Sequence, residues 1–583
     1  MNRINVLPPE VARKIAAGEV IERPVSVVKE LVENSLDAGA SEIAVELANG
    51  GKSLLLVRDD GHGMGRRDAL LCFERHSTSK ISGEDDLASI ATLGFRGEAL
   101  ASIAAVSRLT LKTAEGGEEA GTRVDIEGGA EAAVSSIAFP RGASVEVRDL
   151  FFNLPARRKF MQGDTAELGQ IVKYLTGVAL AYPRLRLSAA HGTRSVLSCP
   201  PVEGLRERIF QLYGRAALDA LMEVEFTEDG MRLSGLASRP PAGRTNRAHQ
   251  LFFVNKRPVR DKILSSALSQ AYRGLLEKDR FPEAFLFLAV PAGEVDVNVH
   301  PAKSEVRFRA SGPIFQLVLR AVDKARRQAG GIKAAALEGT SEAGVLSGTN
   351  KASRPAGPVD LAYIPGESLP GEGLPLRVAE GGGSSQGPAS DILDGPPELR
   401  VLGQYADAYI IAADAEGLLV VDQHNAHERV LYDRYVEIDR RRSWPVQTAL
   451  IPLVFEASPS QAVALESGRS LLEESGFRVE PMGGRSYALR EYPDIFAPAD
   501  ALIALLALLE DVRSDKAGDR KARLLATMAC KTAVKAGQPL PREKMEFLVR
   551  ELFRTSNPAV CPHGRPIVVR LDRAAFEKGL GRR

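Results

Sequence analysis

An amphipathic helical segment, followed by a strand and an acidic glycine-rich turn, constrains this chain most. Residues 27–37 read Val-Val-Lys-Glu-Leu-Val-Glu-Asn-Ser-Leu-Asp, so Glu30 and Asn34 lie one turn apart on one helical face. Residues 59–63, Asp-Asp-Gly-His-Gly, follow the apolar strand 54–57. A carboxylate and an amide on one face can orient a water and hold a divalent cation. An Asp in a glycine turn can accept a nucleobase amino group where no Cβ blocks the approach. The sequence contains no G-x-x-x-x-G-K-[ST], so the pattern predicts a nucleotide hydrolase that is not built on a Walker loop.

The length and charge of the chain limit its class. At 583 residues it is too long for one core, and a length prior gives roughly three to four domains. Lys and Arg total 76 against 75 for Asp and Glu, so any basic surface for nucleic acid must be local. Four scattered cysteines are too few for a disulfide framework, which indicates a reducing compartment. We read neither a signal peptide nor an apolar run of about 18–20 residues. A cytoplasmic protein without a membrane segment is therefore expected.

Changes in pattern along the chain predict four segments. Residues 1–225 alternate helical and strand-like stretches, and residues 226–330 continue as a smaller α/β unit. In residues 331–396 Gly, Ser, Pro, Ala and Glu dominate, and such a segment cannot bury enough surface to offset its ordering entropy, so we expect a disordered linker. Residues 397–583 form a third α/β unit. The expected helices cover 25–37, 261–276 and 314–327, and the expected strands 43–47, 53–58, 251–254, 285–290, 295–299 and 418–421.

Two further polar segments complete a nucleotide-binding constellation. Residues 75–80, Arg-His-Ser-Thr-Ser-Lys, are turn-like, and residues 94–100, Gly-Phe-Arg-Gly-Glu-Ala-Leu, form a glycine loop that opens a helix. Backbone amides at such a helix start bind phosphate. Taken alone, each element has an ordinary interpretation as a solvated face, a turn or a loop. Their conjunction and order favour a nucleotide site.

This series resembles the GHKL ATPases, the superfamily that includes gyrase, chaperone and histidine-kinase ATPases, and within it the MutL family of DNA mismatch-repair proteins. Residues 15–24, 33–40, 94–100 and 149–160 carry the resemblance, which covers both ends of the chain and leaves out only the linker. It implies an α/β (α+β) fold with an N-terminal GHKL (Bergerat) sandwich, a small ribosomal-protein-like α/β domain and a C-terminal α/β dimerisation domain. It also implies an ATP-driven homodimer that works with MutS on double-stranded DNA.

The same resemblance implies roles for single residues. Glu30 would be the general base for the attacking water, Asn34 a Mg²⁺ ligand, and Asp59 the acceptor for the adenine amino group. Lys303 would reach the γ-phosphate from the second unit, a contact that depends on the state of the nucleotide. The remaining nucleotide contacts would be Gly61, Gly63, Thr78, Ser79, Lys80, Gly94, Phe95, Arg96, Gly97, Glu98, Ala99 and Leu100.

One departure from the family concerns the adenine. The family usually has Gly-Thr where this chain has Gly142 and Ala143. The missing hydroxyl puts a second, water-bridged adenine contact in question. Ser144 is adjacent, but in a strand its side chain would point to the other face.

A second constellation lies in the C-terminal segment, where Asp422, His424 and Glu428 precede Cys561 and His563. Carboxylate, imidazole and thiolate are ligand types for first-row metals, and the sulfur favours zinc. Asp422 and His424 share a face if the preceding strand continues, whereas His424 and Glu428 share one if a helix has begun. The alternative is that these His and Cys residues are only packed in a core.

The metal interpretation is supported by resemblance to the endonuclease-type members of the family. They carry D-Q-H-A-x-x-E-x-x-x-x-E, A-C-[KR] and C-P-H-G-R-P, and this chain departs twice: Asn425 stands for Ala and Asp433 for the last Glu. The resemblance implies one tight Zn²⁺ site and a weaker Mn²⁺ or Mg²⁺ position, with Asp422 and Glu428 catalytic. Both departures are expected to be tolerable.

A local basic cluster, Lys256, Arg257 and Arg260, stands out in an otherwise balanced chain. MutL proteins place a DNA-binding groove between their N-terminal halves, so DNA is favoured over an ordinary solvated face. No motif that reads bases is present. Binding through this cluster should therefore be phosphate-driven, sequence-blind and steeply salt-dependent.

A short motif in the C-terminal segment, Gln447, Leu450 and Pro452 in Gln-Thr-Ala-Leu-Ile-Pro, resembles the Q-x-x-[LI]-x-P peptides that dock on the replication sliding clamp. An ordinary strand entry is the alternative interpretation.

The sequence as a whole predicts a MutL-type mismatch-repair ATPase that also nicks DNA. An ATP-gated matchmaker without nuclease activity is the first alternative, and it differs only in whether the C-terminal metal set works. A topoisomerase-type ATPase subunit is a remote alternative. It would need a catalytic tyrosine domain or an acidic toprim-like pattern, and the sequence shows neither.

Overall fold

The structure is a computed structural model. It describes residues 17–18, 20–74, 77–79, 97–244, 247–276, 280–296, 306–329, 399–441, 444–511, 517–534, 537–579 and 582. The chain divides into two compact units, one of residues 1–331 with 437–531 and the other of residues 332–436 with 532–583. The predicted linker lies outside the described residues. None of the described helices combines the length and apolar character that crossing a membrane requires.

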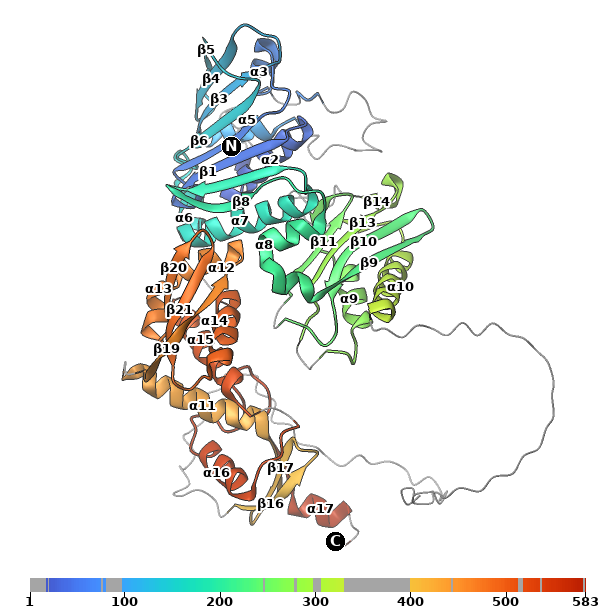
Figure 1. Ribbon diagram of the computed structural model, residues 1–583, viewed down its shortest axis with the longest axis vertical. Coiled ribbons are helices and arrows are strands. Elements are labelled where there is room, and N and C mark those ends of the chain that lie inside the picture. Colours follow the sequence, from blue (N-terminus) through green and yellow to red (C-terminus); the bar gives the residue numbers. More distant parts are fainter. Residues whose placement is uncertain are drawn as a thin grey trace, which may run out of the picture. The chain divides into compact units, whose positions relative to one another are not determined.

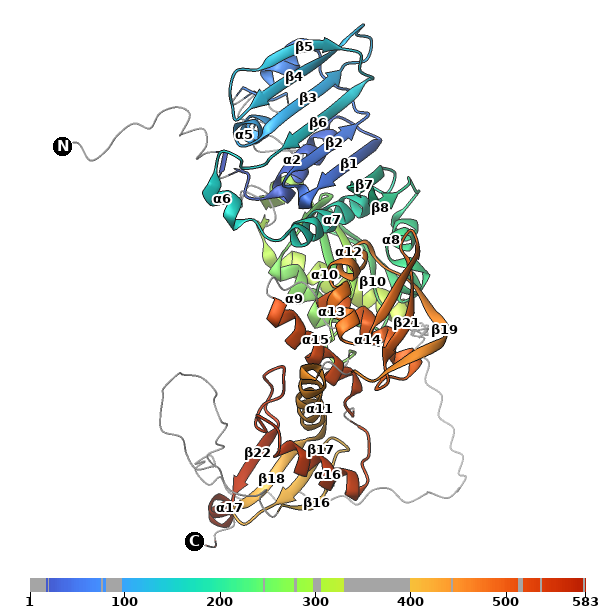
Figure 2. The same cartoon turned by 90° about the vertical axis from the view of Figure 1, so that its left-hand side faces the viewer.

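An eight-stranded sheet dominates the N-terminal part of the first unit, with strand order β5-β4-β3-β6-β2-β1-β7-β8 (Figure 2). Neighbouring strands pair antiparallel, except that β1 and β7 run parallel. The strands are β1 (Glu42–Ala48), β2 (Leu54–Asp59), β3 (Arg108–Ala114), β4 (Gly121–Glu127), β5 (Ala133–Ile137), β6 (Gly142–Arg148), β7 (Arg186–His191) and β8 (Arg194–Cys199).

Helix α2 (Pro24–Asp37) confirms the predicted first helix. Proline at its first position lacks only an N–H that would have no intrahelical partner. The helix buries Val28, Leu31 and Val32 in the core of the sheet, which leaves the Glu30 and Asn34 face for another use. The other helices of this part are η1 (Asn49–Gly51), α3 (Arg66–Leu71), α5 (Ala99–Ala105), α6 (Pro155–Phe160), α7 (Asp164–Ala181) and α8 (Leu205–Asp219).

A second sheet follows, with strand order β12-β11-β13-β10-β9 and the helices α9 and α10 side by side on one face (Figure 1). Its first strand begins at Leu221, so it crosses the predicted boundary at residue 225. The elements are β9 (Leu221–Glu228), β10 (Met231–Ser238), β11 (Gln250–Val254), β12 (Arg257–Val259), α9 (Lys262–Ala271), β13 (Ala284–Ala289), η2 (Ala292–Glu294), β14 (Val295–Asp296), β15 (Arg307–Phe308) and α10 (Ser311–Ala329).

The remaining part of the first unit contains a three-stranded antiparallel sheet in the order β19-β21-β20. The pairing of β19 with β21 jumps from Thr448 to Leu453, so residues 449–452 form a bulge on an edge strand. The elements are β19 (Val446–Glu456), α12 (Pro459–Ser467), α13 (Arg469–Glu474), β20 (Arg478–Gly483), β21 (Ser486–Pro493), α14 (Pro498–Asp511) and α15 (Ala517–Thr532).

The second unit is built on the antiparallel sheet β16-β17-β18-β22. Strand β18 ends at Asp422 and helix α11 begins at Gln423, which decides between the two alternatives for this segment in favour of the helix. The core includes Ile410, Leu419 and Val421 from the sheet. The elements are β16 (Arg400–Tyr405), β17 (Tyr409–Ala413), β18 (Gly417–Asp422), α11 (Gln423–Arg440), α16 (Arg542–Leu552), β22 (Val568–Asp572) and α17 (Arg573–Gly579).

Candidate functional site

A cavity of about 600 Å³ opens between α2, the turn after β2 and the start of α5. Its size suits a nucleotide, since pockets for small ligands measure roughly 300–1,000 Å³. The predicted residues that line it are Glu30, Asn34, Asp59, Gly63, Thr78, Ser79, Gly97, Glu98, Ala99 and Leu100. Residues remote in sequence thus meet around one volume.

Two neighbouring carboxylates, one at the last residue of β2 and one just after it, have different roles. Asp59 lines the cavity, and it accepts hydrogen bonds from Ser35 Oγ at 2.7 Å and Gly61 N at 2.9 Å. Burial raises the pKa of Asp59, and these hydrogen bonds oppose the rise. Asp60 instead accepts from the backbone N–H groups of Ser41 and Glu42, each at 2.8 Å, and so fixes the turn to β1. Asp59 is therefore the carboxylate placed to accept from a ligand.

Ser35 is a contact that the sequence analysis missed. It is 3% exposed and lies on the apolar face of α2 beside Leu31 and Val32. A serine within an apolar stripe is the signal that could have revealed it, because a buried hydroxyl needs a partner. Ser35 Oγ lies 2.7 Å from Asp59 Oδ2 and 3.1 Å from Leu31 O, and the shorter contact orients the Asp59 carboxylate.

Glycine is required at two positions of the cavity wall. Gly63 has a φ of 72°, and a Cβ there would lie 1.9 Å from the carbonyl oxygen of Ala114. Gly97 has a φ of 62°, and a Cβ there would lie 2.5 Å from the carbonyl oxygen of Ser77. The second approach holds the 77–79 segment beside the start of α5, both of which line the cavity.

One predicted nucleotide contact within the described residues, Gly61, does not line this cavity. Gly61 supports Asp59 through its backbone N–H instead. Ala143 and Val145 of β6 line the cavity and Ser144 does not, as strand alternation predicts, so the hydroxyl of Ser144 does not replace the usual Thr. Outside the described residues lie Lys80, Gly94, Phe95, Arg96 and Lys303.

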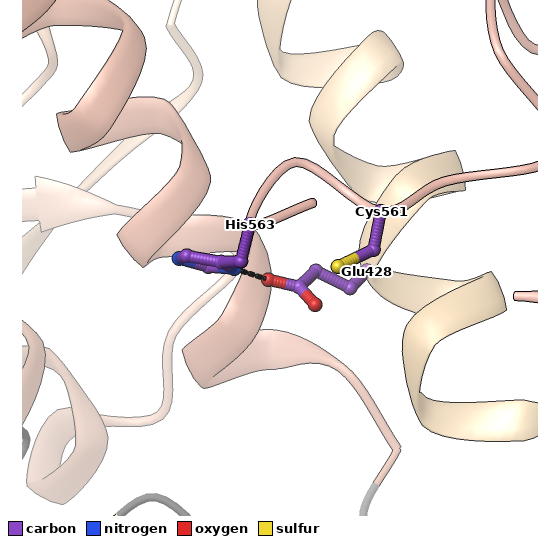
Figure 3. A group of neighbouring side chains, drawn as sticks. All are labelled: Glu428, Cys561 and His563. Atoms are coloured by element: carbon purple, nitrogen blue, oxygen red, sulfur yellow. Dashed lines mark ion pairs between the residues drawn. The ribbon is translucent and has the colours of Figure 1, made fainter. Parts of the chain in front are cut away.

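A cluster of potential metal ligands lies in the second unit, where Glu428, Cys561 and His563 each offer a ligand atom within 4.8 Å of the others (Figure 3). Glu428 is 1% exposed, and its Oε1 is the ion-pair partner of His563 Nδ1. Hydrogen bonding to Cys561 and to Glu428 raises the pKa of His563 to about 10. The carboxylate and the thiol together keep a proton on the imidazole. A cation could replace this proton, because carboxylate, thiol and imidazole are all metal-binding groups.

The other two predicted ligands are not part of this cluster. Asp422 Oδ1 accepts from Asn425 N at 2.9 Å and caps the start of α11. His424 Nδ1 lies 2.8 Å from the carbonyl oxygen of Val534 and must donate to it, which leaves the Nε2 lone pair for a ligand. His427 differs, because its Nδ1 accepts from Val534 N at 2.9 Å. Burial lowers the pKa of His427, so this histidine is held neutral.

The predicted DNA-binding residues differ in exposure. Lys256 and Arg260 are exposed, whereas Arg257 on β12 is 9% exposed. A guanidinium that is buried in this way is not placed to contact phosphate, so Arg257 is removed from the proposed contact set. Lys256 Nζ lies 5.7 Å from the centre of the Tyr182 ring.

The short C-terminal motif lies on β19. Leu450 is 99% exposed in the bulge, and Ile451 beside it is also exposed. Gln447 Nε2 donates to the carbonyl oxygen of Phe496 at 2.7 Å. Pro452 is half-buried within the bulge. The bulge therefore presents Leu450 to solvent while Gln447 is held by the protein itself.

Comparisons with known proteins extend this picture. The family model for histidine kinase-, DNA gyrase B-, and HSP90-like ATPases matches residues 22–149. The model for the C-terminal domain of DNA mismatch repair proteins matches residues 209–327, and the MutL C-terminal dimerisation domain matches residues 402–540. The cavity and the first model define an ATP-binding protein of the GHKL class.

The whole-chain relatives identify the family. The DNA mismatch repair protein MutL of Anaeromyxobacter sp. (strain K) is 41% identical, and that of Koribacter versatilis is 38% identical, each match covering 100% of both chains. Among solved structures, the Aquifex aeolicus MutL ATPase domain complexed with ADP is 28% identical over 52% of this chain and 98% of that one, with a TM-score of 0.37. The chain belongs to the MutL family of DNA mismatch repair proteins. It is a mismatch-repair ATPase with a dimerisation domain.

Proposed function

We propose that this protein is an ATP-gated dimeric clamp that couples mismatch recognition by MutS to strand incision, and that it makes the incision itself. The observation that carries the second half of this proposal is the convergence of Glu428, Cys561 and His563 within 4.8 Å. The first half of the proposal, the ATP-gated clamp, rests on the ATPase site, since binding of ATP changes the contacts available to a closing clamp.

In the nucleotide cavity, Asp59 accepts from the adenine amino group and is oriented by Ser35. Glu30 and Asn34 lie on the same face of α2 and line the same cavity. Glu30 takes a proton from the attacking water, and Asn34 would supply an amide oxygen to hold Mg²⁺. The 77–79 segment and the start of α5 close over the phosphates, where helix-start N–H groups bind anions.

In the metal centre, Glu428, Cys561 and His563 would hold a Zn²⁺ ion, with His424 Nε2 available from the same helix. Thiolate and imidazole suit zinc, and the carboxylates of Glu428 and Asp422 suit a second, harder cation such as Mn²⁺ or Mg²⁺. When bound, such a cation supplies an activated water and neutralises charge on a scissile phosphate. Asp422 terminates β18 and caps α11, so it fixes the start of the helix that carries Glu428.

The homodimer is proposed to form through the outer face of the β16-β17-β18-β22 sheet. Leu418 pairs with Leu571 and Val420 with Val569, so these four side chains share the face opposite the buried Leu419 and Val421. Val569 and Leu571 are exposed in the single chain, as are Leu402, Tyr405 and Tyr409 of the same sheet. An exposed apolar sheet face of this kind is typically buried in an interface, and a second copy of the chain presents the same face for a symmetric dimer.

DNA and the sliding clamp are further proposed partners. Lys256 and Arg260 are exposed and suit phosphate contacts, and Leu450 in the β19 bulge suits an apolar pocket on the clamp. Replacing Leu450 with Ala is expected to reduce clamp binding in a pull-down with purified clamp. An unchanged yield would remove the clamp from the proposal.

The experiment that tests incision uses supercoiled circular DNA with the full chain and Mn²⁺. Appearance of relaxed circles supports nicking, and Asp422→Asn is expected to abolish it while ATP hydrolysis continues. The two activities separate because the nucleotide cavity and the metal centre lie in different compact units. Nicking that survives Asp422→Asn in a preparation free of other nucleases would contradict the assignment.

An ATP-gated matchmaker without nuclease activity is the second candidate. It is favoured by one observation: among the described residues the ligand cluster contains neither Asp422 nor His424, and the Asp422 Oδ1 atom is already a helix cap. No nicking by the wild-type chain with any divalent metal would make this the preferred function.

A further inference from the structure

The segment that carries Cys561 and His563 is a closed hairpin-like turn. Val560 and Pro566 form an antiparallel bridge at its base. Inside it, Cys561 N donates to Arg565 O and Gly564 N donates to Cys561 O, each at 2.9 Å. Figure 3 shows Cys561 and His563 approaching Glu428 from this turn. The position of the turn against α11 therefore decides whether the three groups meet.

Helix α11 holds both arms of the turn at its base. Asn425 Nδ2 donates to Pro566 O at 3.2 Å, and Arg429 Nε donates to Val560 O at 3.0 Å. The two acceptors belong to the residues of the bridge itself. Asn425 and Arg429 are each 8% exposed, so these hydrogen bonds are shielded from water and costly to lose.

A third residue on the same helix, Asp433, adds further hydrogen bonds to this segment. Asp433 Oδ1 accepts from Arg429 Nη1 at 3.2 Å, and Asp433 Oδ2 accepts from Ser556 N at 2.6 Å. Asp433 thus orients the guanidinium of Arg429 and also holds the chain that leads into the turn. Asn425, Arg429 and Asp433 are spaced four residues apart, which places them along one face of α11.

We infer that Asn425, Arg429 and Asp433 are positioning residues that hold the 560–566 turn so that Cys561 and His563 meet Glu428. We name these three residues the turn brace. None of them belongs to the ligand cluster. Two of them, Asn425 and Asp433, are the departures from the usual family pattern, so the departures have a structural use in this chain. This inference depends on the proposed function in one respect, namely that the assembled cluster is a metal site.

Hydrogen exchange of the backbone tests the brace without any metal. In full-length protein treated with a chelator, Arg429→Lys is expected to speed exchange of peptides covering 556–567 by roughly tenfold, since lysine cannot bond Val560 O and Asp433 together through a planar fork. Arg434→Lys is the matched control, because Arg434 lies on the same helix and is exposed. Equal exchange in both variants and the wild type would overturn the inference.

Metal titration then separates positioning from ligation. Titrated with Co²⁺ and Zn²⁺, Arg429→Lys and Asp433→Asn are expected to bind with about 10–100-fold lower affinity, as is usual for partners that orient ligands. Asn425→Ala loses one neutral hydrogen bond and is expected to cost about two- to tenfold. At saturation each variant should keep the thiolate–Co²⁺ absorption band, whereas Cys561→Ser should lose it.

The outcomes distinguish failure of the brace from failure of the metal centre. Wild-type affinity in Arg429→Lys and Asp433→Asn, with the band lost in Cys561→Ser, would refute the brace and keep the metal site. A wild-type chain that binds neither metal would refute the metal centre, and the exchange comparison would still decide whether the brace holds the turn.

Discussion

The nucleotide cavity and the proposed metal centre have a similar arrangement of elements and differ in their electrostatics. Each places a carboxylate at the last residue of a strand, Asp59 in β2 and Asp422 in β18, and each uses one helix, α2 or α11. In the cavity, burial raises the pKa of Asp59, and neutral donors orient it. In the metal centre, the Cys561 thiol and the Glu428 carboxylate raise the pKa of His563 to about 10. This contrast agrees with the proposed roles, in which the first site accepts from a neutral amino group and the second receives a cation.

The two sites also differ in how far apart their parts lie in sequence. Glu30, Asn34 and Asp59 come from α2 and β2, with only β1 and η1 between them in the chain, and their relative placement follows from one helix packing on one sheet. Glu428 and the turn with Cys561 and His563 are separated by the whole of residues 437–531, which belong to the other compact unit. The part of the cavity that these three residues form therefore depends on contacts between elements close in sequence, whereas the proposed metal centre depends on contacts that close a long loop.

The largest expected effect separates the two sites through catalysis. Glu30→Ala should lower the ATP turnover rate by about 10²–10⁴-fold, the usual cost of losing a general base, while ATP still binds. Glu30→Gln should behave alike, since it keeps the size and loses the basicity. Zinc content should stay at the wild-type level in both. ATP turnover at the wild-type rate would show that Glu30 is not the base.

The reciprocal experiment disturbs the metal centre alone. Cys561→Ser should lower zinc affinity by about 100-fold or more, because serine does not supply a thiolate. Steady-state ATP hydrolysis should not change, and it serves as the internal control for folding of the first unit. A parallel loss of ATP hydrolysis would show that the two sites are not independent.

The pH dependence of ATP binding sharpens the electrostatic contrast. Asp59 accepts from adenine only when ionised, so affinity should be full above its folded-state pKa and fall as pH decreases through it. Because burial raises this pKa, the loss should begin at a higher pH than for an ordinary Asp. Asp59→Asn should cost about 10–100-fold in affinity at neutral pH and remove this acid limb, as fluorescent-nucleotide titration can measure. An acid limb that persists in Asp59→Asn would belong to another group.

A smaller effect concerns the proposed DNA surface. Arg260→Glu should weaken binding several-fold on every sequence and flatten the slope of log K against log salt by about one unit. Arg232→Glu is the control, because Arg232 is an exposed arginine on β10, in the sheet whose strand β12 ends just before Arg260, and it pairs with Glu225. Fluorescence anisotropy at several salt concentrations measures both. Equal slopes in Arg260→Glu and the wild type would place the DNA contact elsewhere.

The smallest expected effect concerns the departure at residue 143. Ala143→Thr returns a hydroxyl to the wall of the nucleotide cavity and should lower KM for ATP by about two- to tenfold, the worth of one hydrogen bond. Ala143→Val has the same shape without the hydroxyl and should not lower KM. If Thr and Val give the same KM, the hydroxyl has no part in adenine binding.

The sequence by itself determined the class, the order of elements and most of the nucleotide site. The α2 helix, the strands β1 and β2 and the α5 start lie where periodicity and turn residues predicted them, because these signals are local. Glu30, Asn34 and Asp59 could be assigned to one site from the sequence, since the helix period and the end of the strand fix the directions of their side chains. The family followed from motifs long enough to exclude chance, and the full-length relatives confirm it.

Only the tertiary structure decided which distant residues meet. Strand alternation cannot reveal that Arg257 is buried, nor that β19 bulges at Leu450. The sequence grouped five metal ligands, whereas the folded chain brings three together and uses Asp422 Oδ1 as a cap. It also gives Asn425 and Asp433, which looked like tolerable exceptions, partners far along the chain, in the 560–566 turn and in the segment that leads into it. Such contacts form only when long loops close. The free energy that offsets loop closure comes from contacts across the whole fold, so no local sequence pattern reveals it.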